Sequence, residues 1–222
     1  MIKLIDIQPK GLSISTPQAW RSWLNDITEW QHDLLHNHRP DGGEIYRFPL
    51  VQYHARGFRG LQAGTSLLLK ILPLLEAEAD LEISTLKHEI KMLPKAKIYN
   101  LNRWQPFNAN NYTIWNEKRA LAERVQLLES ILVANILGFC REVGFEIPNK
   151  SLQVRLVDAL EDLGFQRFST LNAELYRKTF NIRFECNIDL PENIGLGRGS
   201  SKGFGRLYLE NQKVKRAHKI LL

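Results

Sequence analysis

The order of hydrophobic patterns along residues 1–92 limits the fold of this chain more than any other feature. Alternating apolar and polar residues indicate strands, and an apolar residue every three to four positions indicates a helix. Strand-like patterns cover 2–7, 47–53, 56–62 and 81–92, and helix-like patterns cover 17–34 and 65–78. Pro73 lies inside the second helical pattern and should kink or shorten that helix. The order is β-α-β-β-α-β, which predicts a ferredoxin-like unit.

The rest of the chain repeats this alternation less regularly. Strand-like stretches cover 97–104, 152–157, 180–188 and 204–209. We expect a loop at 108–111 and one long helix from Trp115 to about Glu142, with its apolar residues on one face. The sequence thus predicts an α+β chain of two tandem ferredoxin-like (RRM-like) domains, 1–94 and 95–222, with the boundary just after Pro94.

A glycine-rich segment at 194–207, called the glycine loop below, carries the most specific chemical signal. Its five glycines are Gly195, Gly197, Gly199, Gly203 and Gly205. Glycine permits positive φ and close approach of a ligand to the main chain, and successive N–H groups can form an anion-binding concavity. Arg198, Lys202 and Arg206 add positive charge. The loop therefore suits a polyanion, and the simpler alternative is a flexible basic surface turn.

Two common nucleotide-binding motifs do not match the glycine loop. A P-loop needs a lysine directly after its last glycine, whereas Lys202 precedes Gly203. The G-x-G-x-x-G fingerprint needs a third glycine where this chain has Ser200. A nucleotide pocket of either kind is excluded.

Positive charge is concentrated at the C-terminal end of the sequence. Residues 194–219 contain seven Lys or Arg and one acid, Glu210, a net charge of +6 that equals the +6 of the whole chain. Such asymmetry is typical of nucleic-acid binding. A solvated basic tail that binds nothing would look similar.

Histidines near the end of the first helical pattern are the candidate catalytic groups. Histidine is the side chain best suited to transfer protons at neutral pH. On one continuous helix, His36 would face solvent and His38 would point back toward the core. Either could also be a surface imidazole that caps the helix. A His-x-His pair can bind zinc, but the sequence offers no recognisable third ligand, so no metal site is predicted.

Cysteine usage and hydropathy restrict where the protein works. The two cysteines, Cys140 and Cys186, lie in different segments without metal-ligand spacing, so we expect buried, reduced thiols in a cytoplasmic protein. No apolar run approaches the roughly 18 residues of a membrane span, and the N-terminus does not read as a signal peptide. A membrane partner is not expected.

Three features together resemble a known protein family. They are the ferredoxin-like first half, a histidine near the end of its first helix followed by Pro-Leu-Val-Gln-Tyr at 49–53, and Leu-Pro-Glu-Asn-Ile-Gly-Leu-Gly at 190–197 leading to Lys-Gly-Phe-Gly-Arg at 202–206. This combination resembles the CRISPR-associated repeat-processing endoribonucleases of the RAMP superfamily, most closely the b-type branch.

The resemblance implies metal-independent cleavage of CRISPR repeat transcripts without a cofactor. A ribose 2′-hydroxyl attacks the adjacent phosphate and leaves a 2′,3′-cyclic phosphate and a 5′-hydroxyl. The resemblance places the catalytic histidine at His36 or His38, Tyr46 as its partner, and Arg39 or Arg47 at the phosphate. It places RNA contacts at Gly195, Gly197, Arg198, Gly199, Lys202, Gly203, Gly205 and Arg206.

Partners beyond the CRISPR repeat RNA stay open at this point, because the family includes monomers, homodimers and proteins that join interference complexes. The alternative function is a non-catalytic RNA-binding subunit of a CRISPR interference complex. A third class is a protein-interaction module whose basic C-terminus binds an acidic partner.

Overall fold

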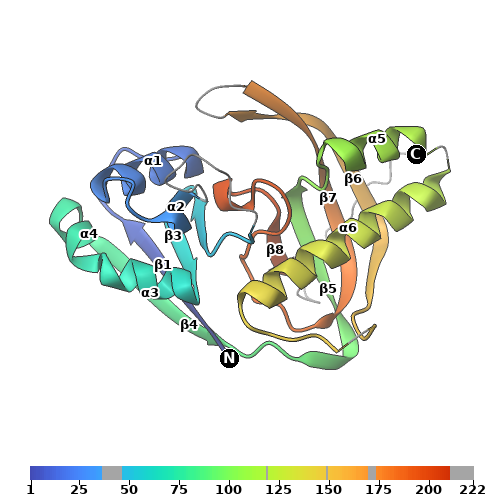
Figure 1. Ribbon diagram of the computed structural model, residues 1–222, viewed down its shortest axis with the longest axis horizontal. Helices are drawn as coiled ribbons and strands as arrows, with labels where there is room; N and C mark the ends of the chain where they lie inside the picture. The colour runs from blue at the N-terminus through green and yellow to red at the C-terminus, as the bar shows by residue number, and fades with distance from the viewer. Residues whose placement is uncertain (37–46, 119, 149, 170–173, 211–222) are drawn as a thin grey trace.

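The computed structural model describes residues 1–36, 47–118, 120–148, 150–169 and 174–210 (Figure 1). These residues form two four-stranded antiparallel sheets, each accompanied by helices. This arrangement confirms the predicted α+β class with two ferredoxin-like halves. Among the described residues, no helix is both long and apolar enough to cross a membrane.

The first sheet has the strand order β2-β3-β1-β4, as a ferredoxin-like unit requires. Its elements are β1 (Ile2–Pro9), α1 (Pro17–Ile27), α2 (Asp33–His36), β2 (Val51–His54), β3 (Gly57–Leu61), α3 (Ala63–Lys70), α4 (Leu72–Glu78) and β4 (Leu81–His88). The central strand β1 pairs Leu4 with Leu61 of β3 and with Leu86 of β4. The helical pattern at 65–78 is interrupted at Ile71, and Pro73 lies in the first turn of α4, as predicted.

The second sheet has the order β6-β7-β5-β8, which places its strands as in the first sheet. Its elements are β5 (Met92–Trp104), α5 (Ala109–Glu117), α6 (Leu121–Glu142), β6 (Val154–Ser169), β7 (Glu174–Ile188), the short 3-10 helix η1 (Ser200–Lys202) and β8 (Arg206–Leu209). The second helix of an ideal unit would lie between β7 and β8. The glycine loop with η1 occupies that position in the chain.

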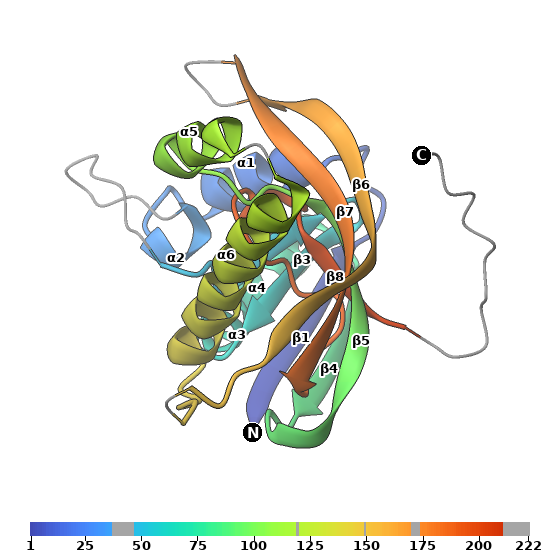
Figure 2. The same cartoon turned by 90° about the vertical axis from the view of Figure 1, so that its right-hand side faces the viewer.

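Several predicted boundaries in this region are wrong. The expected loop at 108–111 begins helix α5, because the Asn108 side chain accepts the N–H of Asn111 at 2.7 Å and caps the helix. The long helix starts at Leu121 instead of Trp115, since the backbone at Ala120 is extended. Strands β6 and β7 also extend well beyond the predicted stretches and form a hairpin that projects past α5 (Figure 2).

The first long helix is shorter than predicted as well. α1 ends at Ile27, where the hydroxyl of Thr28 donates to the carbonyl of Leu24 at 2.8 Å. Glu29 and Trp30 then adopt positive φ, which no helix continues through. The short helix α2 is therefore a separate element, so a helical wheel drawn from α1 does not give the direction of His36.

One hydrophobic core joins the two halves. Ile2, Leu4 and Leu61 of the first sheet belong to the same buried cluster as α6 and the second sheet. Phe48 packs edge-on against Phe139 of α6 with ring centroids 5.2 Å apart. Burial of this shared apolar surface fixes how the two sheets sit relative to each other.

Both cysteines are buried, as predicted. Cys140 and Cys186 are free thiols that expose 1% and 0% of their surface. Burial raises the pKa of the Cys140 thiol to about 12 and that of Cys186 to about 11. At neutral pH neither is a thiolate, so both are unreactive core residues.

Candidate functional site

The glycine loop folds into a tight turn that only glycines permit. Four of its five glycines have positive φ, between +63° and +84°, and they are Gly197, Gly199, Gly203 and Gly205. A Cβ on Gly205 would lie 1.9 Å from the carbonyl oxygen of Leu196. Gly195 must be glycine for a different reason, since a Cβ there would lie 2.9 Å from the Cβ of Ser200. The predicted positive φ is therefore present, and the protein's own close packing excludes side chains at Gly195 and Gly205.

Most N–H groups of the loop are used inside the protein, which corrects the expectation of a continuous row of bare donors. The N–H of Leu196 donates to Gly205 at 2.8 Å, for example, and that of Lys202 to Gly199 at 2.8 Å. Among the described residues, the N–H groups of Ile194, Gly197, Gly199, Ser200 and Ser201 donate to no other group. The longest run of free donors is thus in the turn that enters η1.

The first half of the chain holds the glycine loop in place. Gln52 of β2 accepts the N–H of Gly195 at 2.7 Å and donates to the carbonyl of the same residue at 3.1 Å. Arg59 of β3 donates to the carbonyl of Asn193 at 2.7 Å. Gln52 exposes only 2% of its surface. These bonds join residues far apart in sequence and position the loop at the junction of the two halves.

The neighbouring residue Tyr53 connects the glycine loop to α2. A Cβ built on Gly203 would lie 3.4 Å from the main-chain oxygen of Tyr53. The Tyr53 hydroxyl donates to the carbonyl of Leu35 at 3.1 Å, and burial raises its pKa. The Tyr53 backbone therefore lies next to the glycine loop, and its side chain reaches the backbone just before His36.

Lys202 lies in a cluster of cations drawn from three elements. Its pKa is lowered to about 8 by burial, with further lowering by the charges of Arg21 on α1 and Arg177 on β7. Burial also lowers the pKa of Arg21. Three positive groups that crowd together at a partly buried place favour an anion among them.

Arg206 points into a different hollow, of about 380 Å³, between β1, β2, β3 and β8. There Arg59 and Arg206 both donate to the Asn193 carbonyl, at 2.7 and 2.6 Å. Arg59 also pairs with Asp6 at 2.6 Å, and His54 lies 3.3 Å from the same carboxylate. Burial would raise the pKa of Asp6, but the His54 hydrogen bond and the Arg59 charge outweigh it and lower that pKa. Asp6 is therefore ionised, and it faces a surplus of cations.

The three predicted cations of the loop are thus not brought together. Lys202 faces Arg21 and Arg177, Arg206 faces Arg59, and Arg198 lines a third hollow beside α5 and α6. The loop distributes its positive charge over three neighbouring places.

The predicted catalytic residues are only partly within the described structure. His36 is the last residue of α2, whereas His38, Arg39 and Tyr46 lie outside the described residues, as does the basic segment after 210. Arg47, also proposed for the phosphate, forms an ion pair with Asp33 of α2 at 3.3 Å.

Sequence reasoning missed Gln52, Arg21 and Arg177. Gln52 lies in the Pro-Leu-Val-Gln-Tyr stretch that carries the family resemblance, but the sequence does not indicate that its side chain holds the glycine loop. Arg21 lies on the polar side of an amphipathic helix, where a charged residue is ordinary. Arg177 falls in the part of β7 that the strand pattern did not cover.

Two family models match the chain, the Cas6b N-terminal domain over residues 1–99 and the Cas6b C-terminal domain over residues 91–209. No curated protein matches the sequence.

Several solved structures share the fold. A crystal structure of Cas6b superimposes with a TM-score of 0.76 at 20% identity, covering 94% of this chain and 99% of that one. A crystal structure of the CRISPR RNA processing endoribonuclease Cas6b gives 0.67 at 19% identity, with coverage of 94% and 99%. Csf5, a CRISPR-Cas type IV Cas6 crRNA endonuclease, gives 0.64 at 14% identity, with coverage of 95% and 99%. These identities carry over the fold alone.

Proposed function

The chain belongs to the Cas6b family, and we propose that it is an endoribonuclease that matures CRISPR RNA. Its substrate is the transcript of the CRISPR repeat, and the cut lies within that repeat. The similar structures of a CRISPR RNA processing endoribonuclease and a crRNA endonuclease support this reading.

The proposed reaction is an internal transesterification. The 2′-hydroxyl before the scissile phosphate loses its proton and attacks phosphorus, and the 5′-oxygen of the next nucleotide leaves with a proton. The nucleophile is already attached to the substrate, which supplies the proximity advantage. His36 or His38 transfers a proton and Tyr46 assists, in the roles that the family resemblance implies. A cation stabilises the charge that develops on the phosphorane.

The link through Tyr53 is the observation that supports this assignment best. Its main-chain oxygen borders Gly203 and its hydroxyl holds the carbonyl of Leu35, directly before His36. A strand of RNA bound to the cation cluster around Lys202 would therefore pass close to the end of α2.

Cleavage of the host CRISPR repeat RNA by histidine variants tests the proposal. His36→Ala or His38→Ala should slow cleavage on the order of 10²–10⁴-fold while the dissociation constant for RNA is unchanged. His32→Ala, at the start of the same segment, is the matched control and should cleave at the wild-type rate.

Two outcomes would contradict the proposal. Full activity in both variants would mean that neither histidine takes part. Tight binding of the repeat by the wild-type protein without any cleavage would favour the alternative of a non-catalytic RNA-binding subunit.

A further inference from the structure

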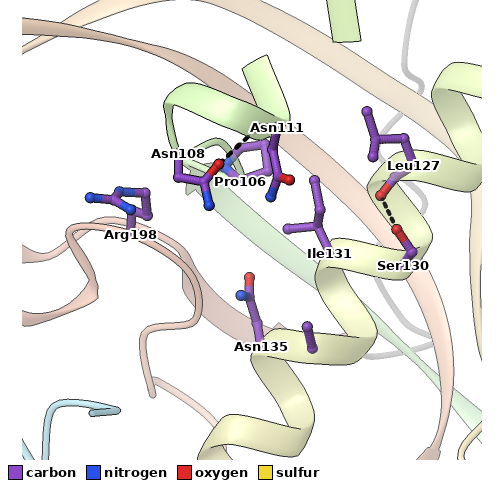
Figure 3. A pocket seen from close by; sticks show the side chains of 9 residues that line it. Pro106, Asn108, Asn111, Leu127, Ser130, Ile131, Asn135 and Arg198 are labelled. Atoms are coloured by element: carbon purple, nitrogen blue, oxygen red, sulfur yellow. Dashed lines mark hydrogen bonds between the residues drawn. The ribbon is translucent and has the colours of Figure 1, made fainter. Parts of the chain in front are cut away.

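A hollow of about 420 Å³ opens where the glycine loop meets α5 and α6 (Figure 3). Three asparagines line it, Asn108 and Asn111 at the start of α5 and Asn135 on α6. Its volume falls within the roughly 300–1,000 Å³ that small-molecule ligands occupy in proteins. We call this hollow the amide pocket.

Hydrogen bonds fix the orientation of two of these amides. The Asn108 side-chain oxygen accepts the N–H of Asn111 at 2.7 Å, and that of Asn135 accepts the indole N–H of Trp104 at 3.0 Å. Each oxygen is thus occupied by the protein, and each NH₂ group is left as a donor. Within the described chain, neither NH₂ group nor the Asn111 side-chain amide is bonded to another residue. The pocket therefore offers donors from several directions to a ligand rich in acceptors.

The remaining walls are apolar on one side and cationic on the other. Leu127 and Ile131 lie one turn apart on α6, and Ile131 points into the hollow beside the amides (Figure 3). Arg198 stands at the rim with its guanidinium directed away from the asparagines (Figure 3). Its main-chain N–H donates to Gln105 at 3.1 Å, which fixes this part of the glycine loop against the pocket. Among the residues that the structure describes, none that lines the pocket is an acid.

A nucleobase with its phosphate has the matching chemistry. A base is flat and apolar on its faces, it carries carbonyl and ring-nitrogen acceptors along its edge, and it is attached to an anion. Proteins recognise RNA in this way by hydrogen-bonding the edges of unpaired bases that are turned out of the strand. We propose that the amide pocket binds one unpaired base of the RNA, with the adjoining phosphate at Arg198. This inference rests on the proposed function, because it takes RNA to be the substrate.

The test combines pocket variants with RNAs that lack a single base. Asn108→Ser keeps a side-chain oxygen that caps α5 about as well as asparagine does, and it removes the NH₂ group. Asn111→Ala removes the second amide and keeps the backbone N–H that the cap needs. Asn110→Ala is the matched control, since Asn110 lies on the same turn but is exposed and does not line the pocket.

The dissociation constant is measured for the host CRISPR repeat RNA and for a series in which each nucleotide in turn is abasic. For the wild-type protein, one abasic position should weaken binding about tenfold, as expected for the loss of one or two hydrogen bonds. The Asn108→Ser/Asn111→Ala variant should bind intact RNA about tenfold more weakly. Removing the base at that position should then cause no further loss of affinity. Asn110→Ala should behave as wild type throughout.

The base pocket is refuted if the wild-type protein binds the repeat but the double variant loses the same factor in RNA affinity, relative to wild type, at every abasic position. If the double variant melts at a lower temperature than wild type, Asn111→Ala alone gives the same comparison with the cap intact. A wild-type protein that does not bind the repeat at all would overturn the proposed function and the base pocket with it. Full cleavage activity combined with position-independent losses would overturn the pocket alone.

Discussion

Replacing Gln52 with methionine should destabilise the protein through the glycine loop. Methionine has a similar volume and leaves no large cavity, but it cannot replace the bonds of 2.7 and 3.1 Å to the N–H and carbonyl of Gly195. Both Gly195 and Gln52 are buried. Each buried main-chain group that loses its partner costs about 1–3 kcal/mol. The free energy of unfolding should therefore fall by about 2–6 kcal/mol. The loss should be near the lower value if the loop moves and water reaches the two unpaired groups.

Urea unfolding followed by tryptophan fluorescence measures this loss. Gln31→Met is the matched control, because Gln31 is exposed and, within the part of the chain that the structure describes, its side-chain amide bonds only to Glu29, at 3.1 Å. That surface change should alter the free energy of unfolding by about 0.5 kcal/mol or less. A Gln52→Met variant no less stable than Gln31→Met would refute the view that the first half of the chain anchors the loop.

Three further predictions concern the loop itself. Gly205→Ala places a Cβ 1.9 Å from the Leu196 oxygen, whereas Gly144→Ala places one in open space at a similar φ of +74°. In thermal melting and RNA binding, Gly144→Ala should cost about 1 kcal/mol, and Gly205→Ala should lower the stability and the RNA affinity much more. Equal effects of the two variants would mean that the turn relaxes. Because the pKa of Lys202 is about 8, its charged fraction falls from about nine-tenths at pH 7 to about one-tenth at pH 9. RNA affinity should fall over this range in the wild type and stay nearly constant in Lys202→Arg, and parallel pH profiles would contradict a Lys202–phosphate contact. At pH 7 the pair Arg198→Ala and Lys202→Ala should reduce the slope of log K against log salt by about 1.4, the value for two phosphates of a single strand; an unchanged slope would show that neither cation binds phosphate.

The fold of the first half could be predicted because its periodicities are strong and its turns are marked. Strands, hairpin and helices follow the predicted order, and even the interruption near Pro73 is present. The second half was predicted less well. Asparagine is common in loops and is also favoured as a helix N-cap. The sequence predicts a loop at 108–111, whereas Asn108 is the N-cap of α5.

The candidate site depends on contacts that local sequence patterns do not encode. The partner of Gln52 is 143 positions away in the chain. Lys202 lies near enough to Arg21 and Arg177 for their charges to lower its pKa, although α1, η1 and β7 are far apart in the sequence. The direction assigned to His36 assumed one continuous helix, and the positive φ of Glu29 and Trp30 removes that assumption. The catalytic roles of His36, His38 and Tyr46 stay predictions.

The decisive experiment uses a repeat RNA with one 2′-deoxynucleotide placed directly 5′ of the cut. We expect this RNA to bind as tightly as the all-ribose repeat and not to be cleaved, because the attacking oxygen has been removed from the substrate. Cleavage of the deoxy-substituted RNA at the rate of the all-ribose RNA would contradict the proposed reaction.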